Sequence, residues 1–130
     1  MAGTDMWVKN RPLKVGHTLT ISGIPKTGVQ RFVVNISSGV DHALHMSVQF
    51  HGAVIYNSYQ GGVWGDEVRH GGCPFKYDKL FKFTVTLTRE EFLVVLSDGS
   101  EVHFPNRLGA SEYKDFSFDE GVLIRSFEIN

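Results

Sequence analysis

Alternation of polar and apolar side chains is the clearest pattern along the chain. In the stretch ALHMSVQFH, every second residue is polar: His45, Ser47, Gln49 and His51. The residues between them are apolar, and FKFTVTLT at 81–88 repeats the alternation. Successive side chains of a β-strand point to opposite faces of a sheet. The pattern therefore predicts strands with an apolar face toward a core and a polar face outward.

Further strands are expected where β-branched and aromatic residues cluster between turn formers. These segments are TLTISG at 18–23, RFVVNIS at 31–37, AVIYNSY at 53–59 and GVLIRSFEIN at 121–130. EFLVVLSDGSEVHF at 91–104 predicts a hairpin around a two-residue Asp98-Gly99 turn. Another turn is expected at Gly23-Ile24-Pro25, and only ASEYKDF at 110–116 leaves room for a short helix.

About ten short strands with no long helical stripe predict an all-β fold, an antiparallel two-sheet β-sandwich. No composition shift, repeat or low-complexity tract divides the sequence, so residues 1–130 are expected to form a single domain. Terminal strands would leave exposed sheet edges at which two copies can pair about a two-fold axis. We therefore expect a homodimer.

Net charge, apolar runs and cysteine content indicate which partners and which compartment to expect. The formal net charge is −1, which offers no basic excess for nucleic acid. No apolar run reaches the roughly 18 residues of a membrane helix, so membrane insertion is not expected. Cys73 is the single cysteine, which fits a reducing compartment. The N-terminal stretch has no signal-peptide core, so the protein is expected in the cytoplasm, with export by a route without a signal peptide left open.

Several polar side chains are expected to share one outer face of the sandwich. Asn57 would point outward with the row His45, Ser47 and Gln49 if its neighbours Val54 and Tyr56 point inward. The next segment adds an indole, an acid and a base: Trp64, Glu67 and Arg69. Sugar hydroxyls both donate and accept hydrogen bonds, and the C–H face of a pyranose packs against an aromatic ring. This combination of groups predicts a sugar-binding site.

WGDEVR at 64–69 resembles the W-G-x-E-x-R signature of the galectins. Asn57, in VIYNS, resembles the asparagine of the family's V-x-N strand. CPF at 73–75 and FPNRL at 104–108 also resemble family stretches at the expected distances, with FPNRL expected to be structural. The resemblance extends from about Leu13 to Ile129.

The resemblance implies a galectin-like jelly roll that binds β-galactosides in a groove on its concave sheet. In the family, Trp stacks on galactose, Glu and Arg bind hydroxyls of galactose and of the neighbouring sugar, and Asn binds the hydroxymethyl oxygen. These roles fall on Trp64, Glu67, Arg69 and Asn57. The implied partners are glycans or glycoproteins that contain β-galactosides.

The preceding strand departs from the family's H-x-N-P-R pattern. His45 is kept, but Ser47 and Gln49 stand where the family has Asn and Arg. In the family these residues read the axial hydroxyl at C4 of galactose. Each substitution removes about 1–2 kcal/mol of binding free energy, so weaker binding or altered specificity is expected. His51 lies near a shortened loop and is expected to touch a second sugar.

An alternative function is a galectin-fold structural or protein-interaction module with vestigial sugar binding. Trp64 would then cover a sheet edge, and Glu67 and Arg69 would form a surface ion pair of little energetic weight. The substitutions at Ser47 and Gln49 are the feature that separates the two functions.

Enzymatic chemistry is not expected. Asp66 and Glu67 are adjacent on an extended segment and point to opposite faces, so they cannot flank one glycosidic bond. The six histidines are scattered without metal-ligand spacing, so no metal is expected. No motif for a cofactor is found, and no residue is assigned a catalytic role.

Overall fold

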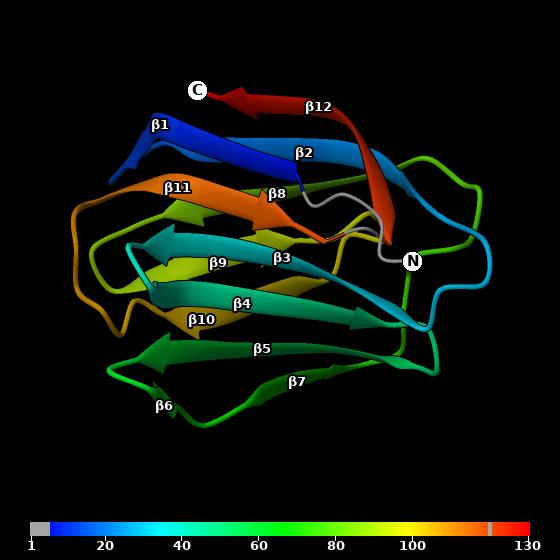
Figure 1. The fold of residues 1–130 in the computed structure, drawn as a ribbon, viewed down its shortest axis with the longest axis horizontal. Helices are drawn as coiled ribbons and strands as arrows, with labels where there is room; N and C mark the ends of the chain where they lie inside the picture. Colours follow the sequence, from blue (N-terminus) through cyan, green and yellow to red (C-terminus); the bar gives the residue numbers. More distant parts are fainter. Residues whose placement is uncertain (1–5, 120) are drawn as a thin grey trace.

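Two antiparallel sheets pack face to face in the computed structural model, which describes residues 6–119 and 121–130 (Figure 1). The seven-stranded sheet has the order β1-β11-β3-β4-β5-β6, with β7 also pairing with β5. Its strands are β1 (Met6–Lys14), β3 (Arg31–Ser38), β4 (Asp41–Gln49), β5 (Ala53–Gln60), β6 (Val63–Trp64), β7 (Val68–Gly71) and β11 (Glu112–Phe118). The predicted β-sandwich is confirmed.

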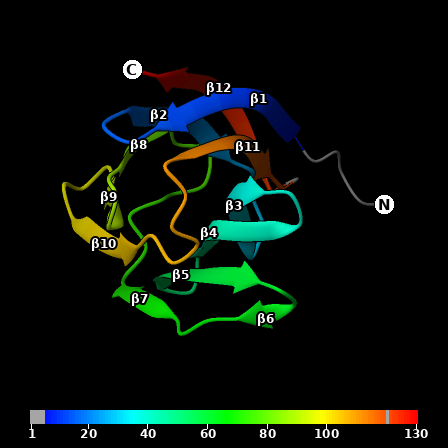
Figure 2. The same cartoon turned by 90° about the vertical axis from the view of Figure 1, so that its left-hand side faces the viewer.

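The five-stranded sheet forms the second layer behind the first, and both layers are visible edge-on in Figure 2. Its order is β10-β9-β8-β2-β12. Its strands are β2 (Thr18–Pro25), β8 (Phe81–Leu87), β9 (Glu91–Val95), β10 (Glu101–Pro105) and β12 (Val122–Ile129). The first strand β1 and the last strand β12 are therefore edge strands, one in each sheet.

Aromatic rings join the two sheets in the core. Phe32 of β3 stacks on Phe81 of β8, with ring centroids 5.6 Å apart. Phe75, from the CPF stretch, lies edge-on to both rings, at 5.6 Å from Phe32 and 5.0 Å from Phe81. All of these rings are buried. The alternation along β4 and β8 thus places their apolar residues in one shared core.

The short helix considered at 110–116 is wrong, because this segment enters strand β11. β11 pairs with β1 on one side and β3 on the other, so its backbone groups are satisfied by the sheet. Tyr113 and Phe116 are buried as well. No helix is found in residues 6–119 and 121–130, and therefore none there has the length and hydropathy to cross a membrane.

The turn predicted at Gly23-Ile24-Pro25 is also wrong, since these residues end strand β2. A Cβ at Gly23 would lie 2.7 Å from the carbonyl oxygen of Leu123, so glycine is needed for the close approach of β12. The β9–β10 hairpin is confirmed, but its connection runs over residues 96–100 and is longer than the predicted two-residue turn. Asp98-Gly99 lies within it, with Gly99 at a φ of 85°.

Candidate functional site

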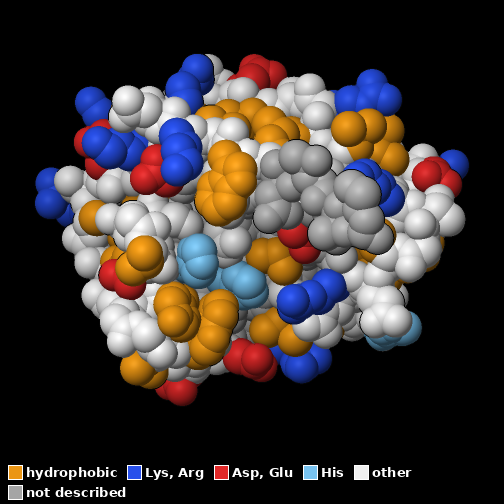
Figure 3. Space-filling view, viewed as in Figure 1, with side chains coloured by type: hydrophobic (Ala, Val, Ile, Leu, Met, Phe, Trp, Pro, Cys, Tyr) orange, Lys and Arg blue, Asp and Glu red, His pale blue; other side chains and the backbone are white. Residues whose placement is uncertain are grey.

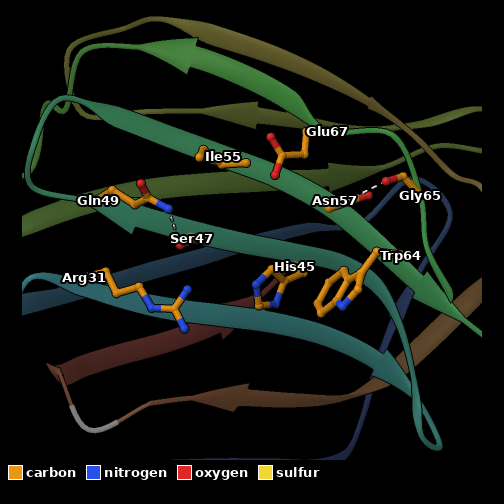
Figure 4. Close-up of a pocket in the computed structure, with 9 residues that line it drawn as sticks. All are labelled: Arg31, His45, Ser47, Gln49, Ile55, Asn57, Trp64, Gly65 and Glu67. Atoms are coloured by element: carbon orange, nitrogen blue, oxygen red, sulfur yellow. Dashed lines mark hydrogen bonds between the residues drawn. The ribbon is translucent and has the colours of Figure 1, made fainter. Parts of the chain in front are cut away.

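A shallow pocket of about 410 Å³ opens on the outer face of the seven-stranded sheet (Figure 4). Strands β3, β4 and β5 form its floor, and the segment after β5 forms one wall. Its lining residues are Arg31, His45, Ser47, Gln49, Ile55, Asn57, Trp64, Gly65 and Glu67. The pocket therefore brings together six of the eight residues assigned from the sequence. Arg69 and His51 are the exceptions.

Strand register explains how residues distant in sequence meet on the pocket floor. His45 of β4 lies opposite Asn57 of β5 and opposite Asn35 of β3. Directly opposed residues of antiparallel strands project to the same face. Asn35 continues the row to Ser117 of β11, to which its Nδ2 donates a hydrogen bond of 3.3 Å. A cross-strand polar row thus runs under the pocket.

The ring of His45 is held in one orientation by this row. Because the Nδ2 of Asn35 donates to Ser117, its Oδ1 accepts from the Nδ1 of His45, at 2.7 Å. Burial, with contributions from His42 and Arg31, lowers the pKa of His45 to about 4. The imidazole is therefore neutral near pH 7. Its Nε2 is left as a hydrogen-bond acceptor for a ligand.

Trp64 lies beside His45, and its indole is partly exposed at the side of the pocket. It lies in β6 opposite Tyr59, and its ring centroid is 4.9 Å from that ring. The His45 ring meets the indole at 4.8 Å with an interplanar angle of 65°. The indole is nevertheless 50% exposed. Figure 3 shows hydrophobic side chains gathered beside histidines on one face of the molecule. Part of the ring is free to pack against an apolar ligand face.

Asn57 has its amide fixed by the protein. Its Nδ2 donates to the carbonyl oxygen of Gly65 at 2.9 Å, and its Oδ1 accepts from the backbone N–H of Ser58 at 2.7 Å. Asn57 itself is buried, at 7% exposure. An amide NH₂ carries a second hydrogen. That hydrogen is the group Asn57 offers to a ligand.

Arg107 supports this arrangement from the FPNR stretch, a role that the sequence prediction missed. Its Nη1 donates to the Oδ1 of Asn57 at 3.3 Å and to the Oγ of Ser58 at 3.1 Å. Its Nη2 donates to the carbonyl oxygen of Asp66 at 2.8 Å. The guanidinium also lies over the ring of Phe104, at 4.7 Å. Arg107 thus ties the segment after Trp64 to strand β5.

The acid and base of the WGDEVR segment are separated by the structure. Glu67 lines the pocket and is exposed. Arg69 lies on β7 opposite Ile55, which lines the pocket, so Arg69 projects to the same face without lining the cavity. Among the described residues, the ion pairs within 4.0 Å involve only His103, so Glu67 and Arg69 form no pair.

The two substituted positions interact with each other. Ser47 is 4% exposed, and the Nε2 of Gln49 donates to its Oγ at 3.4 Å. His51 lies beyond the end of β4 and lines an adjoining cavity of about 250 Å³ with Gln30, Arg31 and Gln49. His51 therefore lies beside the main pocket, and its expected contact with a second sugar stays a prediction.

Arg31 also lines the pocket, although it was not among the site residues assigned from the sequence. It begins β3 opposite Gln49, and Figure 4 shows its guanidinium extending along the strand toward His45. Arg31 and Asn35 fall on alternate positions of RFVVN, so the period-two pattern places both on one face. That periodicity is the signal that could have identified them.

Metal and thiol chemistry find little support in the described residues. No group of three or more His, Cys, Asp or Glu side chains comes together in residues 6–119 and 121–130. Burial raises the pKa of the Cys73 thiol, which disfavours the reactive thiolate. The pocket's chemistry is that of neutral donors and acceptors, two charged side chains and an exposed indole.

Known proteins share both the sequence and the fold. The family model for galactoside-binding lectins matches residues 6–129. A β-galactoside-binding lectin of Electrophorus electricus is 48% identical over 99 residues, covering 72% of this chain and 77% of its own length. Galectin-2 of Homo sapiens is 38% identical over 127 residues, covering 96% of each chain.

Solved structures agree with these relatives. The crystal structure of Dario rerio galectin-1-L2 has a TM-score of 0.92 at 44% identity, covering 96% of this chain and 99% of that one. Congerin II liganded with lactose and MES has a TM-score of 0.91 at 26% identity, covering 98% and 100%. Sequence and structure thus match over nearly the whole chain. This chain belongs to the galectins, the family of galactoside-binding lectins.

Proposed function

We propose that the chain binds β-galactosides in the pocket over β3, β4 and β5. The observation that carries the proposal is the contact of the exposed Trp64 indole with the neutral His45 ring, beside the oriented amide of Asn57. An apolar stacking surface next to fixed donors and acceptors suits a sugar ring. A structural neighbour, congerin II, is known with lactose bound. Galectins are lectins and not enzymes.

Each side chain has a role that its surroundings allow. The indole of Trp64 packs against the C–H face of galactose. The Nε2 of His45 accepts from a hydroxyl, because Nδ1 is already engaged by Asn35. The free N–H of Asn57 donates to the hydroxymethyl oxygen. Glu67 accepts from, and Arg69 donates to, hydroxyls toward the neighbouring sugar; hydrogen bonds to charged groups are worth about 1.5–3 kcal/mol each.

Binding is proposed to be weaker or altered in specificity relative to a galectin with Asn and Arg on β4. Ser47 is short and buried, and the Nε2 of Gln49 donates a hydrogen bond to it and not to a ligand. The loss of about 1–2 kcal/mol at each position corresponds to a combined affinity drop of roughly 10- to 1000-fold.

The alternative is a structural or protein-interaction module with vestigial sugar binding. It is supported by the hydrogen bond between Gln49 and Ser47. The Gln49–Ser47 hydrogen bond satisfies within the protein two groups that would otherwise face a ligand. If this half of the face serves packing, sugar affinity is absent, and the remaining Trp64 surface contacts protein.

Pairing of two copies through the terminal strands is proposed as well. Edge strands β1 and β12 lie at the same end of the sandwich (Figure 1). Both carry exposed apolar residues, with Trp7 at 61% and Leu123 at 50% exposure. A dimer would give two sites and allow cross-linking of glycans. Sedimentation at several protein concentrations tests this association.

Cytoplasmic location and export without a signal peptide remain predictions.

Lactose titration followed by tryptophan fluorescence tests the function. The chain has two tryptophans, so the Trp7→Phe variant assigns the signal to Trp64. The proposal expects a saturable change in the Trp7→Phe variant, and loss of lactose binding in Trp64→Ala when binding is followed by calorimetry. A Kd of about 1 mM corresponds to a binding free energy of about −4 kcal/mol. If lactose gives no response at concentrations far above this range, the interaction module is supported instead.

A further inference from the structure

An apolar row crosses the outer face of the five-stranded sheet at one end of its strands. Ile24 of β2 alternates with buried residues and lies opposite Leu123 of β12, so both side chains face outward. Leu80 directly precedes Phe81, which is buried and lies opposite Gly23 of β2. The alternation of an extended segment therefore directs Leu80 to the same outer face. Leu80 is 66% exposed and Leu123 is 50% exposed, so the row meets solvent.

Basic side chains surround this apolar row. Three segments meet here, at residues 22–27, 76–82 and 121–126, and they carry five lysines or arginines and one acid. The basic residues, all exposed, are Lys26, Lys76, Lys79, Lys82 and Arg125. Among the residues that the structure describes, the ion pairs within 4.0 Å involve only His103. The five cations are therefore unpaired.

The acids near the row do not cancel this charge. Thr27 donates a hydrogen bond to the carboxylate of Asp78, the one acid within the three segments. The carboxylate of Asp119 accepts a hydrogen bond from the backbone N–H of Gly121 at 3.0 Å. With Asp119 and Glu120, which adjoin in sequence, five cations and three acids leave a local charge of +2. The whole chain has a formal net charge of −1, so positive charge is concentrated at this end.

Exposed leucines among unpaired basic side chains suit an anionic lipid surface. The leucines can insert at the boundary of the acyl chains, while lysine and arginine keep their charged ends at the level of the headgroups. Clusters of about four to eight basic residues are typical of sites that bind anionic lipids. Toward the other edge of the same sheet, Glu91 and Glu101 contact His103 on β9 and β10. An anionic surface is therefore attracted to the apolar row and disfavoured at that edge.

We propose that the apolar row of Leu80, Ile24 and Leu123, with its surrounding cations, docks the protein on membranes that contain anionic phospholipids. This docking goes beyond the proposed galactoside binding and does not depend on it. The sugar pocket lies on the outer face of the other sheet, and Figure 2 shows the two sheets as separate layers. A docked molecule therefore keeps its pocket free for a glycan.

Cosedimentation with vesicles tests the proposal. Vesicles of phosphatidylcholine alone are compared with vesicles in which phosphatidylserine replaces part of the phosphatidylcholine. At low salt, the partition of the protein onto the anionic vesicles should be about tenfold higher than onto the neutral ones, and this ratio should fall as salt rises. Saturating lactose should not release the protein, because the vesicles carry no galactoside and the pocket is not part of the docking surface.

Variants at the row separate the electrostatic from the apolar contribution. Lys79→Gln combined with Lys82→Gln should lower partition onto anionic vesicles about tenfold and reduce its dependence on salt. Leu80→Ser should lower partition several-fold and leave the salt dependence unchanged, because it removes only apolar contact. Leu80 adjoins β8, which is two strands from the free edge of β12, so this variant leaves any pairing of copies at that edge intact.

Matched controls come from the opposite sheet. Lys14→Gln combined with Lys114→Gln removes two exposed charges from β1 and β11. Val40→Ser removes a side chain that is 85% exposed between β3 and β4. Both controls change net charge or exposed apolar area as the row variants do, so both should keep the full partition onto anionic vesicles.

The outcomes that overturn the docking surface are distinct from those that bear on the sugar pocket. Equal partition onto neutral and anionic vesicles, no partition at low salt, or partition that survives both sets of row variants overturns it. Release by lactose overturns it as well. Binding of the row to an acidic protein without binding to vesicles would assign the surface to a protein partner and overturn the lipid assignment. Each of these results leaves the proposed galactoside binding standing.

Discussion

Arg107 donates a hydrogen bond to the amide oxygen of Asn57 across 50 residues of sequence, at 3.3 Å. This contact links the turn after β10 to the strand on the pocket floor. It places the FPNR stretch, which the sequence marked as structural, behind the candidate site. The same guanidinium holds the segment that follows Trp64 through the carbonyl oxygen of Asp66.

Replacement of Arg107 by lysine should weaken both the fold and lactose binding. A lysine cannot donate from two nitrogens to Asn57 and Asp66 at once. The expected loss of unfolding free energy is about 1–3 kcal/mol, measured by urea denaturation, and lactose affinity should fall several-fold. Arg89→Lys is the matched control, because Arg89 is an exposed arginine whose side chain makes no hydrogen bond or ion pair among the described residues. Equal stability of both variants would contradict the bracing role.

Gly65→Ala should destabilise the protein for steric reasons. A Cβ at Gly65 would lie 2.7 Å from the Nη1 of Arg107 and 2.9 Å from the Oγ of Ser58. Displacing these groups is expected to cost about 1–3 kcal/mol of unfolding free energy. Gly71→Ala, where no atom lies within 4 Å of the added carbon, should stay within about 0.5 kcal/mol of the parent. Thermal denaturation of both variants checks the contrast; similar melting temperatures would refute it.

His45 should make stability depend on pH in the acidic range. Its folded pKa of about 4 lies below the ordinary value of 6.5, because burial disfavours the imidazolium. Between these values the unfolded chain binds a proton that the folded chain does not, so stability falls as pH drops from about 6.5 to 4. His45→Gln should flatten this slope. His103, whose pKa Glu91 raises, contributes the opposite trend in both proteins and cancels in the comparison.

Denaturant titrations at several pH values between 4.5 and 7.5 measure this difference. Lactose affinity should hold above about pH 5 in the parent, because His45 stays neutral there. Identical pH slopes in the parent and His45→Gln would show that the histidine is not the titrating group.

Restoring the family residues on β4 should strengthen lactose binding. The variant Ser47→Asn with Gln49→Arg is expected to gain roughly 10- to 1000-fold in affinity, measured by calorimetry. The new arginine would lie directly opposite Arg31, and like charges in opposed positions destabilise a strand pair. The gain should therefore be larger, and the stability loss smaller, when Arg31→Gln is added. An unchanged affinity in both backgrounds would count against the proposed orientation of the sugar.

The alternating strands of the fold could be predicted because the polarity of each side chain there indicates whether it faces the core or the solvent. β8 alternates strictly between buried and more exposed residues. In β4 the predicted apolar residues Leu44, Met46 and Val48 are buried, but Ser47 of the polar face is buried as well. β1 carries no such signal, since Leu13 is its single buried residue and a bulge at Asn10 breaks its register. The helix considered at 110–116 failed because pairing on both sides of β11 outweighs local propensity.

The candidate site was predictable only where its residues lie close in sequence. The WGDEVR segment and the His45 row could be recognised from short motifs. Arg107 could not, because its contacts depend on how distant strands and turns meet. Arg31 falls on the pocket face by the alternation of RFVVN, and that signal was not used. His51 was placed on the pocket face by extending the alternation past Gln49, but β4 ends at that residue.

The most direct test of the central claim, that a galactoside binds over Trp64 and His45, is an amide and indole ¹H–¹⁵N NMR titration with lactose. The account predicts that the Trp64 indole N–H signal shifts, together with the amide signals of His45 and Asn57. The Trp7 indole, on edge strand β1, should stay in place. Shifts confined to other parts of the sandwich, or no shift at tens of millimolar lactose, would contradict it.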